Sequence, residues 1–258
     1  MRVLGIDTST FTGGVALVSG DEVVAEYSAI VTRANSESVA AVCERLLADA
    51  GWAVSDLDGV AVAIGPGSFT GVRIGVTMAK VLSYALDLPI GAVVTLDAIA
   101  ANLPFSEALV CPLISARRDL VYTATYRVRG LYPERVSDYE VKSIREVVTR
   151  LRAAVADNTA VADAAGPGGN GAKVLFVGDG ARAHKQVILE NAGDRLAIGP
   201  EWCIGPRPAV VAAMGKLAIR SGQARNAYEV EPFYLGRSSA EMVQGGAMSC
   251  GGRAQGGL

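Results

Sequence analysis

The chain has 258 residues, which is enough for one large domain or two medium-sized domains. Half of the residues are hydrophobic and 19% are charged, and this balance excludes a mainly disordered or collagen-like protein. The 24 basic and 26 acidic side chains give a net charge of −2, so there is no global basic field that could hold nucleic acid. Any contact with RNA must therefore be local or be supplied by a partner.

The four cysteines are far apart and include no CxxC pair, which is typical of proteins from a reducing cytoplasm. Asp7 interrupts the apolar N-terminus, and no later segment reaches about 18 uninterrupted apolar residues. We therefore expect a cytoplasmic protein that does not span a membrane. The one histidine, His184, excludes sites that need two histidine ligands, and we expect neither a metal nor a cofactor.

The first half of the chain predicts three strands, followed by helices that alternate with strands. Short apolar runs and the turn signal at Gly20-Asp21 indicate a meander over 2–6, 13–19 and 22–31. A polar cap at 35–37 and apolar residues at helical spacing predict a first helix that ends at Gly51. Further strands are predicted at 60–64 and 90–94, and further helices at 74–85 and 96–103.

The second half repeats this order of elements. Strands are predicted at 109–115, 120–128, 136–141, 173–177 and 195–198, and helices at 144–155, 181–191 and 209–221. A topology that repeats after about 105 residues indicates two lobes with the same fold. We predict an α/β protein made of two ribonuclease-H-like lobes, the architecture of the actin, Hsp70 and sugar-kinase ATPases.

The two lobes are predicted at 1–104 and 105–240. Residues 156–172 are rich in Ala, Gly, Asp and Asn and cannot contribute to a core, so we interpret them as a mobile surface insertion of the second lobe. Residues 241–258 are rich in glycine, which predicts a disordered tail.

Two motifs of the first lobe are typical of anion sites. Asp7-Thr8-Ser9 follows the first strand, where paired-lobe ATPases place an acid for metal and amides and hydroxyls for phosphate. Gly65 to Gly71 joins a buried strand to a helix N-terminus, which favours an anion, but the lysine of a Walker loop is missing. Both motifs also fit ordinary tight turns. The candidates for a vestigial nucleotide or anion site are Asp7, Thr8, Ser9, Gly65, Gly67, Ser68 and Arg117.

The corresponding hairpin of the second lobe carries Ser115 at the point where two-lobed ATPases present a second acid. Without that carboxylate a hydrolytic water has no obvious base, so we do not expect independent ATP turnover. Arg117 fits either a phosphate ligand or a solvated turn residue. Gly178-Asp179-Gly180 ends a strand and opens a helix, which suits either a nucleotide contact or a structural turn. We assign no catalytic residue.

The first two helices are apolar over more than the stripe of about 100° that one buried face needs. Either both faces are used inside the lobe, or the excess forms an apolar patch for a partner. The candidate residues of such a partner interface are Val39, Val42, Cys43, Leu46, Val72, Met78 and Val81.

Three segments carry a resemblance to a known family: Gly5-Ile6-Asp7-Thr8-Ser9, the run IGPGSFTGVRIG at 64–75, and Glu231-Pro232-Phe233-Tyr234-Leu235. Over residues 1–240, apart from the insertion, the chain resembles the bacterial TsaB (YeaZ-type) family. The resemblance implies a two-lobed accessory subunit, not an enzyme by itself, that pairs with the related TsaD-type catalytic subunit through matching helices. With a TsaE-type ATPase, that complex supports threonylcarbamoyl transfer to adenosine 37 of tRNAs that read codons beginning with A. The tRNA is then contacted only within the complex.

The residues agree with this resemblance, because the catalytic relative needs a histidine pair for its metal and this chain has only His184. One departure is Asn35, which stands where the family commonly has histidine, although asparagine is an equally good helix cap. Two alternatives stay open: a stand-alone ATPase or small-molecule kinase of the same fold, and a glycoprotease-like peptidase. The sequence also leaves open whether the isolated chain is a monomer or a homodimer.

Overall fold

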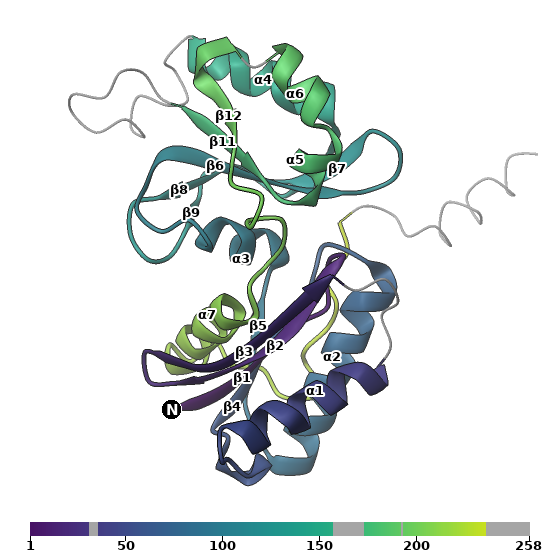
Figure 1. The fold of residues 1–258 in the computed structure, drawn as a ribbon, viewed down its shortest axis with the longest axis vertical. Coiled ribbons are helices and arrows are strands. Elements are labelled where there is room, and N and C mark those ends of the chain that lie inside the picture. The colour runs from purple at the N-terminus through teal and green to yellow at the C-terminus, as the bar shows by residue number, and fades with distance from the viewer. Residues whose placement is uncertain (31–35, 157–172, 192, 236–258) are drawn as a thin grey trace, which may run out of the picture.

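The computed structural model describes residues 1–30, 36–156, 173–191 and 193–235, with only the backbone of 36–38. Its strands form two sheets in two lobes, and helix α3 (Thr95–Ala101) lies between them (Figure 1). Three predicted features lie outside the described residues: the tail at 241–258, the cap Asn35, and the insertion at 156–172 apart from Ala156. Within the described part of the chain, no helix has the length and apolarity needed to span a membrane.

The first sheet has the strand order β3-β2-β1-β4-β5. Its strands are β1 (Arg2–Asp7), β2 (Thr12–Ser19), β3 (Glu22–Ile30), β4 (Gly59–Ala63) and β5 (Ile90–Val93). The first three strands form an antiparallel meander, and β4 and β5 run parallel to β1. Helices α1 (Ser36–Asp49) and α2 (Phe69–Leu86) cover one face of this sheet (Figure 1). A 3-10 turn, Val54–Asp56, lies between α1 and β4 in the chain.

The second sheet repeats this order as β10-β7-β6-β11-β12. Its strands are β6 (Ser106–Ser115), β7 (Leu120–Thr123), β8 (Tyr126–Val128), β9 (Glu134–Arg135), β10 (Glu140–Ser143), β11 (Val174–Val177) and β12 (Leu196–Ile198). Its helices are α4 (Ile144–Ala156), α5 (Asp179–Ala183) and α6 (Lys185–Asn191), and a 3-10 turn spans Gly193–Arg195. The same strand order in both lobes confirms the predicted fold class of two ribonuclease-H-like lobes.

The last helix of each half packs against the sheet of the other lobe. Helix α3 contacts β6 and β8, and its Leu96 is buried with Tyr126. Helix α7 (Pro208–Arg220) covers the free face of the first sheet, where Val211 is buried with Ala61 (Figure 1). In both cases a helix from one side of the expected division at residue 104 packs on the sheet of the other side. Apolar periodicity predicts that a helix buries one face, but it does not indicate which sheet receives that face.

Small residues allow α7 to lie very close to the first sheet. A Cβ atom on Gly215 would lie 2.2 Å from the Cβ of Ala61, and one on Gly91 would lie 2.4 Å from the Cα of Gly215. At the other side of α7, the buried Lys216 donates from Nζ to Asp21 Oδ1 at 3.0 Å in the β2–β3 turn. The helix is therefore an integral layer of the first lobe.

Two elements of the second lobe are shorter than predicted, while one cap is confirmed. The strand expected at 120–128 divides into β7 and β8, which pair with different parts of β6. The helix expected at 181–191 is interrupted at His184, which ends α5. The capping box is present: Ser143 donates its amide to Glu146 Oε2 at 3.1 Å, and the Glu146 amide donates to Ser143 Oγ at 3.3 Å.

Candidate functional site

The turn after β1 holds a buried carboxylate. Asp7 is fully buried, and its Oδ1 accepts hydrogen bonds from the Ser9 amide at 3.0 Å and the Ser9 hydroxyl at 2.5 Å. The other oxygen, Oδ2, has no hydrogen-bond partner among the described residues. Burial raises the pKa of Asp7 to about 7, and the two hydrogen bonds from Ser9 offset only part of this effect.

The glycine loop packs directly onto this turn. The Ser68 amide donates to the carbonyl of Ser9 at 2.7 Å, and the Thr8 hydroxyl donates to the carbonyl of Gly71 at 2.7 Å. A Cβ atom on Gly67 would lie 2.0 Å from the carbonyl oxygen of Ser9, and one on Gly71 would lie 2.0 Å from that of Thr8. The glycines are therefore required because two stretches of backbone touch at these points.

The structure brings six of the seven candidate nucleotide or anion residues together in this turn and loop. The amides that an anion would need are already used in part: that of Ser68 binds Ser9, and that of Gly71 donates to Ser68 Oγ at 3.2 Å. Gly65 is bound to α3, since its amide donates to Thr95 Oγ1 at 3.1 Å. These contacts favour the tight-turn interpretation of both motifs over the anion site. The seventh candidate, Arg117, lies exposed in the β6–β7 turn of the other lobe.

A half-buried carboxylate, Asp179, lies beside Ser115, which corrects the expectation that this position lacks one. Asp179 comes from the start of α5 rather than from the hairpin, and both of its oxygens lie 3.3 Å from the Ser115 amide nitrogen, which donates to them. Burial raises the pKa of Asp179, and its bonds with Ser115 oppose that shift. The carboxylate joins the end of β6 to α5, so its observed contact is structural.

The described thiols and the histidine do not form a nucleophilic set. Cys43, Cys111 and Cys203 are buried, and burial raises the pKa of Cys43 and of Cys111 to about 12. His184 is half-buried at the break between α5 and α6. In the part of the chain that the structure describes, no group of three or more His, Cys, Asp or Glu side chains could hold a metal ion.

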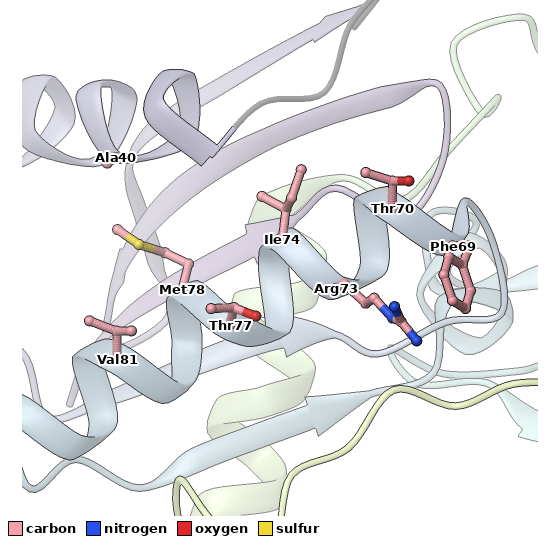
Figure 2. A pocket seen from close by; sticks show the side chains of 8 residues that line it. All are labelled: Ala40, Phe69, Thr70, Arg73, Ile74, Thr77, Met78 and Val81. Carbon is pink, nitrogen blue, oxygen red and sulfur yellow. The ribbon is translucent and has the colours of Figure 1, made fainter.

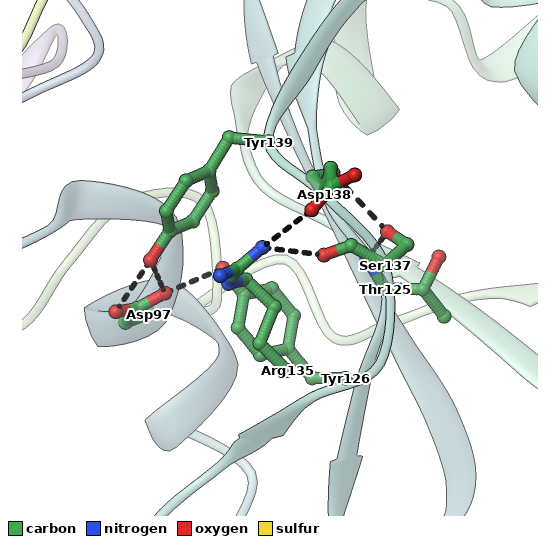
Figure 3. Close-up of polar contacts among 7 residues, drawn as sticks. All are labelled: Asp97, Thr125, Tyr126, Arg135, Ser137, Asp138 and Tyr139. Carbon is green, nitrogen blue, oxygen red and sulfur yellow. Dashed lines mark hydrogen bonds and ion pairs between the residues drawn. The ribbon is translucent and has the colours of Figure 1, made fainter.

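A polar network connects the lobes near α3 (Figure 3). Asp97 Oδ1 accepts hydrogen bonds from the hydroxyl of Tyr126 at 2.6 Å and from that of Tyr139 at 2.8 Å. The guanidinium of Arg135 lies 4.1 Å from the centroid of the Tyr139 ring. The Tyr139 ring also meets the edge of Phe233, a residue packed on the core of the first lobe, with centroids 5.4 Å apart. Burial raises the pKa of Asp97 and of both tyrosines. The network therefore fixes a contact between the lobes, and no sequence motif indicated it.

The structure places most residues of the predicted partner interface on the core of the first lobe. Cys43, Leu46 and Val72 are buried in the core of the first lobe, because α1 and α2 turn these side chains toward the sheet. Another three candidates, Val39, Val42 and Met78, are half-buried and also pack on that core. Val81 has 57% of its side chain exposed, so it is the one candidate of the seven that is plainly accessible.

The accessible face of α2 is a stripe of side chains that, apart from Val81, the count of apolar residues does not indicate. We call the exposed residues Phe69, Arg73, Thr77, Val81 and Tyr84 the α2 stripe. Their spacing of three or four residues places them on one face of the helix. The missed signal was this spacing, because a count of apolar residues does not separate the exposed face from the buried one.

Aromatic pairs mark both ends of the α2 stripe. At its start the rings of Phe69 and Tyr234 have centroids 5.4 Å apart, and at its end those of Tyr84 and Tyr228 are 6.2 Å apart. Tyr84 is 72% exposed and Tyr228 77% exposed. Exposed aromatic side chains at such density are typical of protein interfaces.

A groove runs along the stripe toward α1 (Figure 2). It encloses about 630 Å³, and Ile74 and Met78 point from α2 toward Ala40 of α1. The residues that line it are Ala40, Phe69, Thr70, Arg73, Ile74, Thr77, Met78 and Val81. The lining is apolar or hydroxylic apart from one cation, Arg73.

Comparison with known proteins decides the family. Residues 22–243 match the family model described as "TsaD: tRNA N6-adenosine threonylcarbamoyltransferase". A Bacillus subtilis (strain 168) protein, described as tRNA threonylcarbamoyladenosine biosynthesis protein TsaB, is 36% identical over 242 residues, which are 93% of this chain and 96% of that protein. The chain belongs to the TsaB branch of this family. The resemblance stated from three sequence segments is thereby confirmed, and the protein takes part in tRNA threonylcarbamoyladenosine biosynthesis.

Solved structures related to TsaB agree with the fold. A Pseudomonas aeruginosa protein described as similar to peptidase YeaZ has a TM-score of 0.73 and 25% identity, and the match covers 91% of this chain and 99% of that one. A structure described as YeaZ from the same organism has a TM-score of 0.72 at 24% identity, with the same coverage.

The three segments that resemble TsaB lie together in the folded chain. The Asp7 turn contacts the loop at 65–71, as described above. A Cβ atom on Gly65 would lie 2.6 Å from the carbonyl oxygen of Phe233, so the segment at 231–235 touches the same loop. The family signature thus forms one packed unit at the start of α2, and this unit positions the α2 stripe.

Proposed function

We propose that this protein is a non-catalytic subunit that binds the TsaD-type catalytic subunit. In this role it supports threonylcarbamoyl transfer to adenosine 37 of tRNAs that read codons beginning with A, together with a TsaE-type ATPase. The tRNA is contacted only within the complex. The proposal rests on family membership and, above all, on the exposed α2 stripe.

The surface around the α2 stripe supports the pairing. Exposed aromatic residues and Val81 line one face of a helix that is already anchored to its own core by its opposite face. Because the chain matches a TsaD family model over 22–243, the TsaD-type subunit is a relative of this chain, and we expect it to have comparable helices. Two such helix pairs can meet around an approximate twofold axis and cover each other's apolar residues.

The chemistry of the chain supports an accessory role. One histidine cannot form the histidine pair that the catalytic relative uses for its metal, and the loop at 65–71 has no Walker lysine. The buried Asp7 and the half-buried Asp179 receive hydrogen bonds from their own lobes. We infer that independent turnover is absent.

Reconstitution tests the proposed function. The purified chain is combined with the TsaD-type and TsaE-type proteins of the same cell, ATP, threonylcarbamoyl precursors and tRNA, and threonylcarbamoyladenosine is measured with and without it. We expect the product to depend on the chain, and the chain alone to hydrolyse ATP at no more than about one turnover per hour, against the usual 1 to 1,000 per second of enzymes. Multiple turnover by the chain alone would favour the ATPase or kinase alternative, and cleavage of a protein substrate would favour the peptidase.

The same surface also bears on the isolated chain. An apolar surface that lacks its partner is a candidate for self-association. We therefore propose that the chain forms a homodimer through the α2 stripe when alone, and that the TsaD-type subunit replaces the second copy. Light scattering after addition of this subunit should show the homodimer replaced by a heterodimer.

A further inference from the structure

Arg73 is the cation of the α2 stripe, and it is held from two sides. Its Nε donates to the hydroxyl of Tyr234 at 3.0 Å, and its guanidinium carbon lies 3.7 Å from the centroid of the Phe69 ring. The two aromatic rings also contact each other. A guanidinium that is stacked on one ring and bonded to another has lost much of its freedom before any partner binds.

Within the described part of the chain, the remaining donors of Arg73 are available to a ligand. With Nε used, the two Nη nitrogens have no hydrogen-bond or ion-pair partner among the described residues. They lie at the edge of the groove, whose other lining residues are apolar or carry a hydroxyl (Figure 2). A partner that covers this groove takes the guanidinium out of water, which is costly unless the partner provides an acceptor.

We propose that Arg73 anchors the TsaD-type subunit by binding a carboxylate on the helices that cover the groove. The inference rests on the proposed function and adds the chemistry of the contact. The two Nη groups form a planar fork that matches the two oxygens of a carboxylate. Nucleic acid is a poorer occupant, because residues 1–104 contain 5 basic and 11 acidic side chains and would repel a polyanion.

The test compares Arg73→Gln with a matched control, Arg152→Gln. Arg152 is an exposed arginine of α4 in the other lobe, so its substitution removes the same charge far from the stripe. Titration calorimetry with the purified TsaD-type subunit should show binding about 30-fold weaker for Arg73→Gln and unchanged for Arg152→Gln. Arg73→Lys keeps the charge but loses the fork and should bind about 5-fold more weakly. Tyr234→Phe keeps the ring but removes the hydrogen bond to Arg73 Nε, and this variant should bind the subunit about 3-fold more weakly.

A double-mutant cycle identifies the carboxylate. Each Asp or Glu on the partner's facing helices is changed to Asn or Gln, and one of these changes should have no further effect once Arg73 is Gln. The proposal is overturned if no acidic residue couples to Arg73, if Arg73→Gln binds as well as Arg152→Gln, or if it weakens only tRNA binding. It is also overturned if Arg73→Gln lowers the melting temperature and this loss of stability accounts for the whole loss of binding. If the wild-type chain does not bind the subunit at all, the proposed function itself fails.

Discussion

At the scale of single residues, the most unusual group is Asp7. Its carboxylate is fully buried, one oxygen has no partner among the described residues, and its pKa is raised to about 7. The turn that holds this carboxylate is packed against the loop at 65–71. The protein therefore retains a charged residue whose burial costs stability when it is ionised.

We predict that this cost appears in the pH dependence of unfolding. The pKa of Asp7 is higher in the folded chain than its usual value of 3.8, so the folded state holds the proton more tightly. Through this group alone, the free energy of unfolding is highest below pH 3.8 and falls as the pH rises toward about 7. Over this pH range the free energy of unfolding falls by at most about 4 kcal/mol through the ionisation of Asp7.

The variant Asp7→Asn removes the ionisation and keeps an oxygen that can accept from Ser9. Relative to the wild type, its free energy of unfolding should rise by about 2 to 4 kcal/mol between pH 4 and pH 8, as measured by urea denaturation. A difference that is the same at both pH values would show that Asp7 does not titrate in this range.

At the scale of elements, the contact between the Asp7 turn and the loop at 65–71 determines where α2 begins. The Thr8 hydroxyl donates to the Gly71 carbonyl, and the Ser9 carbonyl accepts from the Ser68 amide. Ser68 also caps the helix, because its hydroxyl oxygen accepts a hydrogen bond from the Gly71 amide. The loop glycines are thus explained by packing, although their pattern in sequence equally fits a phosphate loop.

The variant Gly71→Ala tests this packing. Its Cβ would lie 2.0 Å from the carbonyl oxygen of Thr8, so the turn and the loop must separate. We expect a loss of about 3 kcal/mol in the free energy of unfolding, although alanine is otherwise favoured in a helix. Gly130→Ala is the control, because nothing lies within 4 Å of the position of its Cβ. Equal stability of the two variants would mean that the loop is not held against the turn.

The elements also show what the sequence could predict. The order of strands and helices follows from apolar periodicity and turn residues, and the three family segments correctly marked the region around the start of α2. The periodicity of α2 does not separate its buried from its exposed face, because apolar residues occur on both faces, as the buried Val72 and the exposed Phe69 show. Asp97 and its tyrosines come from distant parts of the chain, and their contact depends on the packing of α3.

At the scale of the whole molecule, the first lobe presents its apolar surface on the side opposite α7. Helix α7 fills one face of the first sheet, and α1 and α2 fill the other, so the α2 stripe is the outer surface of a complete layer. The second lobe is joined to this body through α3 and the contact between Tyr139 and Phe233. A partner on the stripe would therefore bind without separating the lobes.

The variant Val81→Glu tests the use of this surface. Val81 is 57% exposed, so a charge there should change the free energy of unfolding by less than about 0.5 kcal/mol. If the stripe is covered by the TsaD-type subunit, the same charge becomes buried, and we expect binding to weaken by at least about 2 kcal/mol, or 30-fold. The homodimer of the isolated chain should be lost as well. Both effects are measured by titration calorimetry and light scattering.

Leu189→Glu provides the matched control, because Leu189 is 55% exposed on α6 of the second lobe. A new glutamate there has the same charge and nearly the same exposure, but it lies away from the stripe. If Val81→Glu and Leu189→Glu bind the TsaD-type subunit equally well, the interface lies elsewhere on the molecule. If both weaken binding to the same degree, the effect is due to net charge, and the assignment of the α2 stripe as the partner surface is wrong.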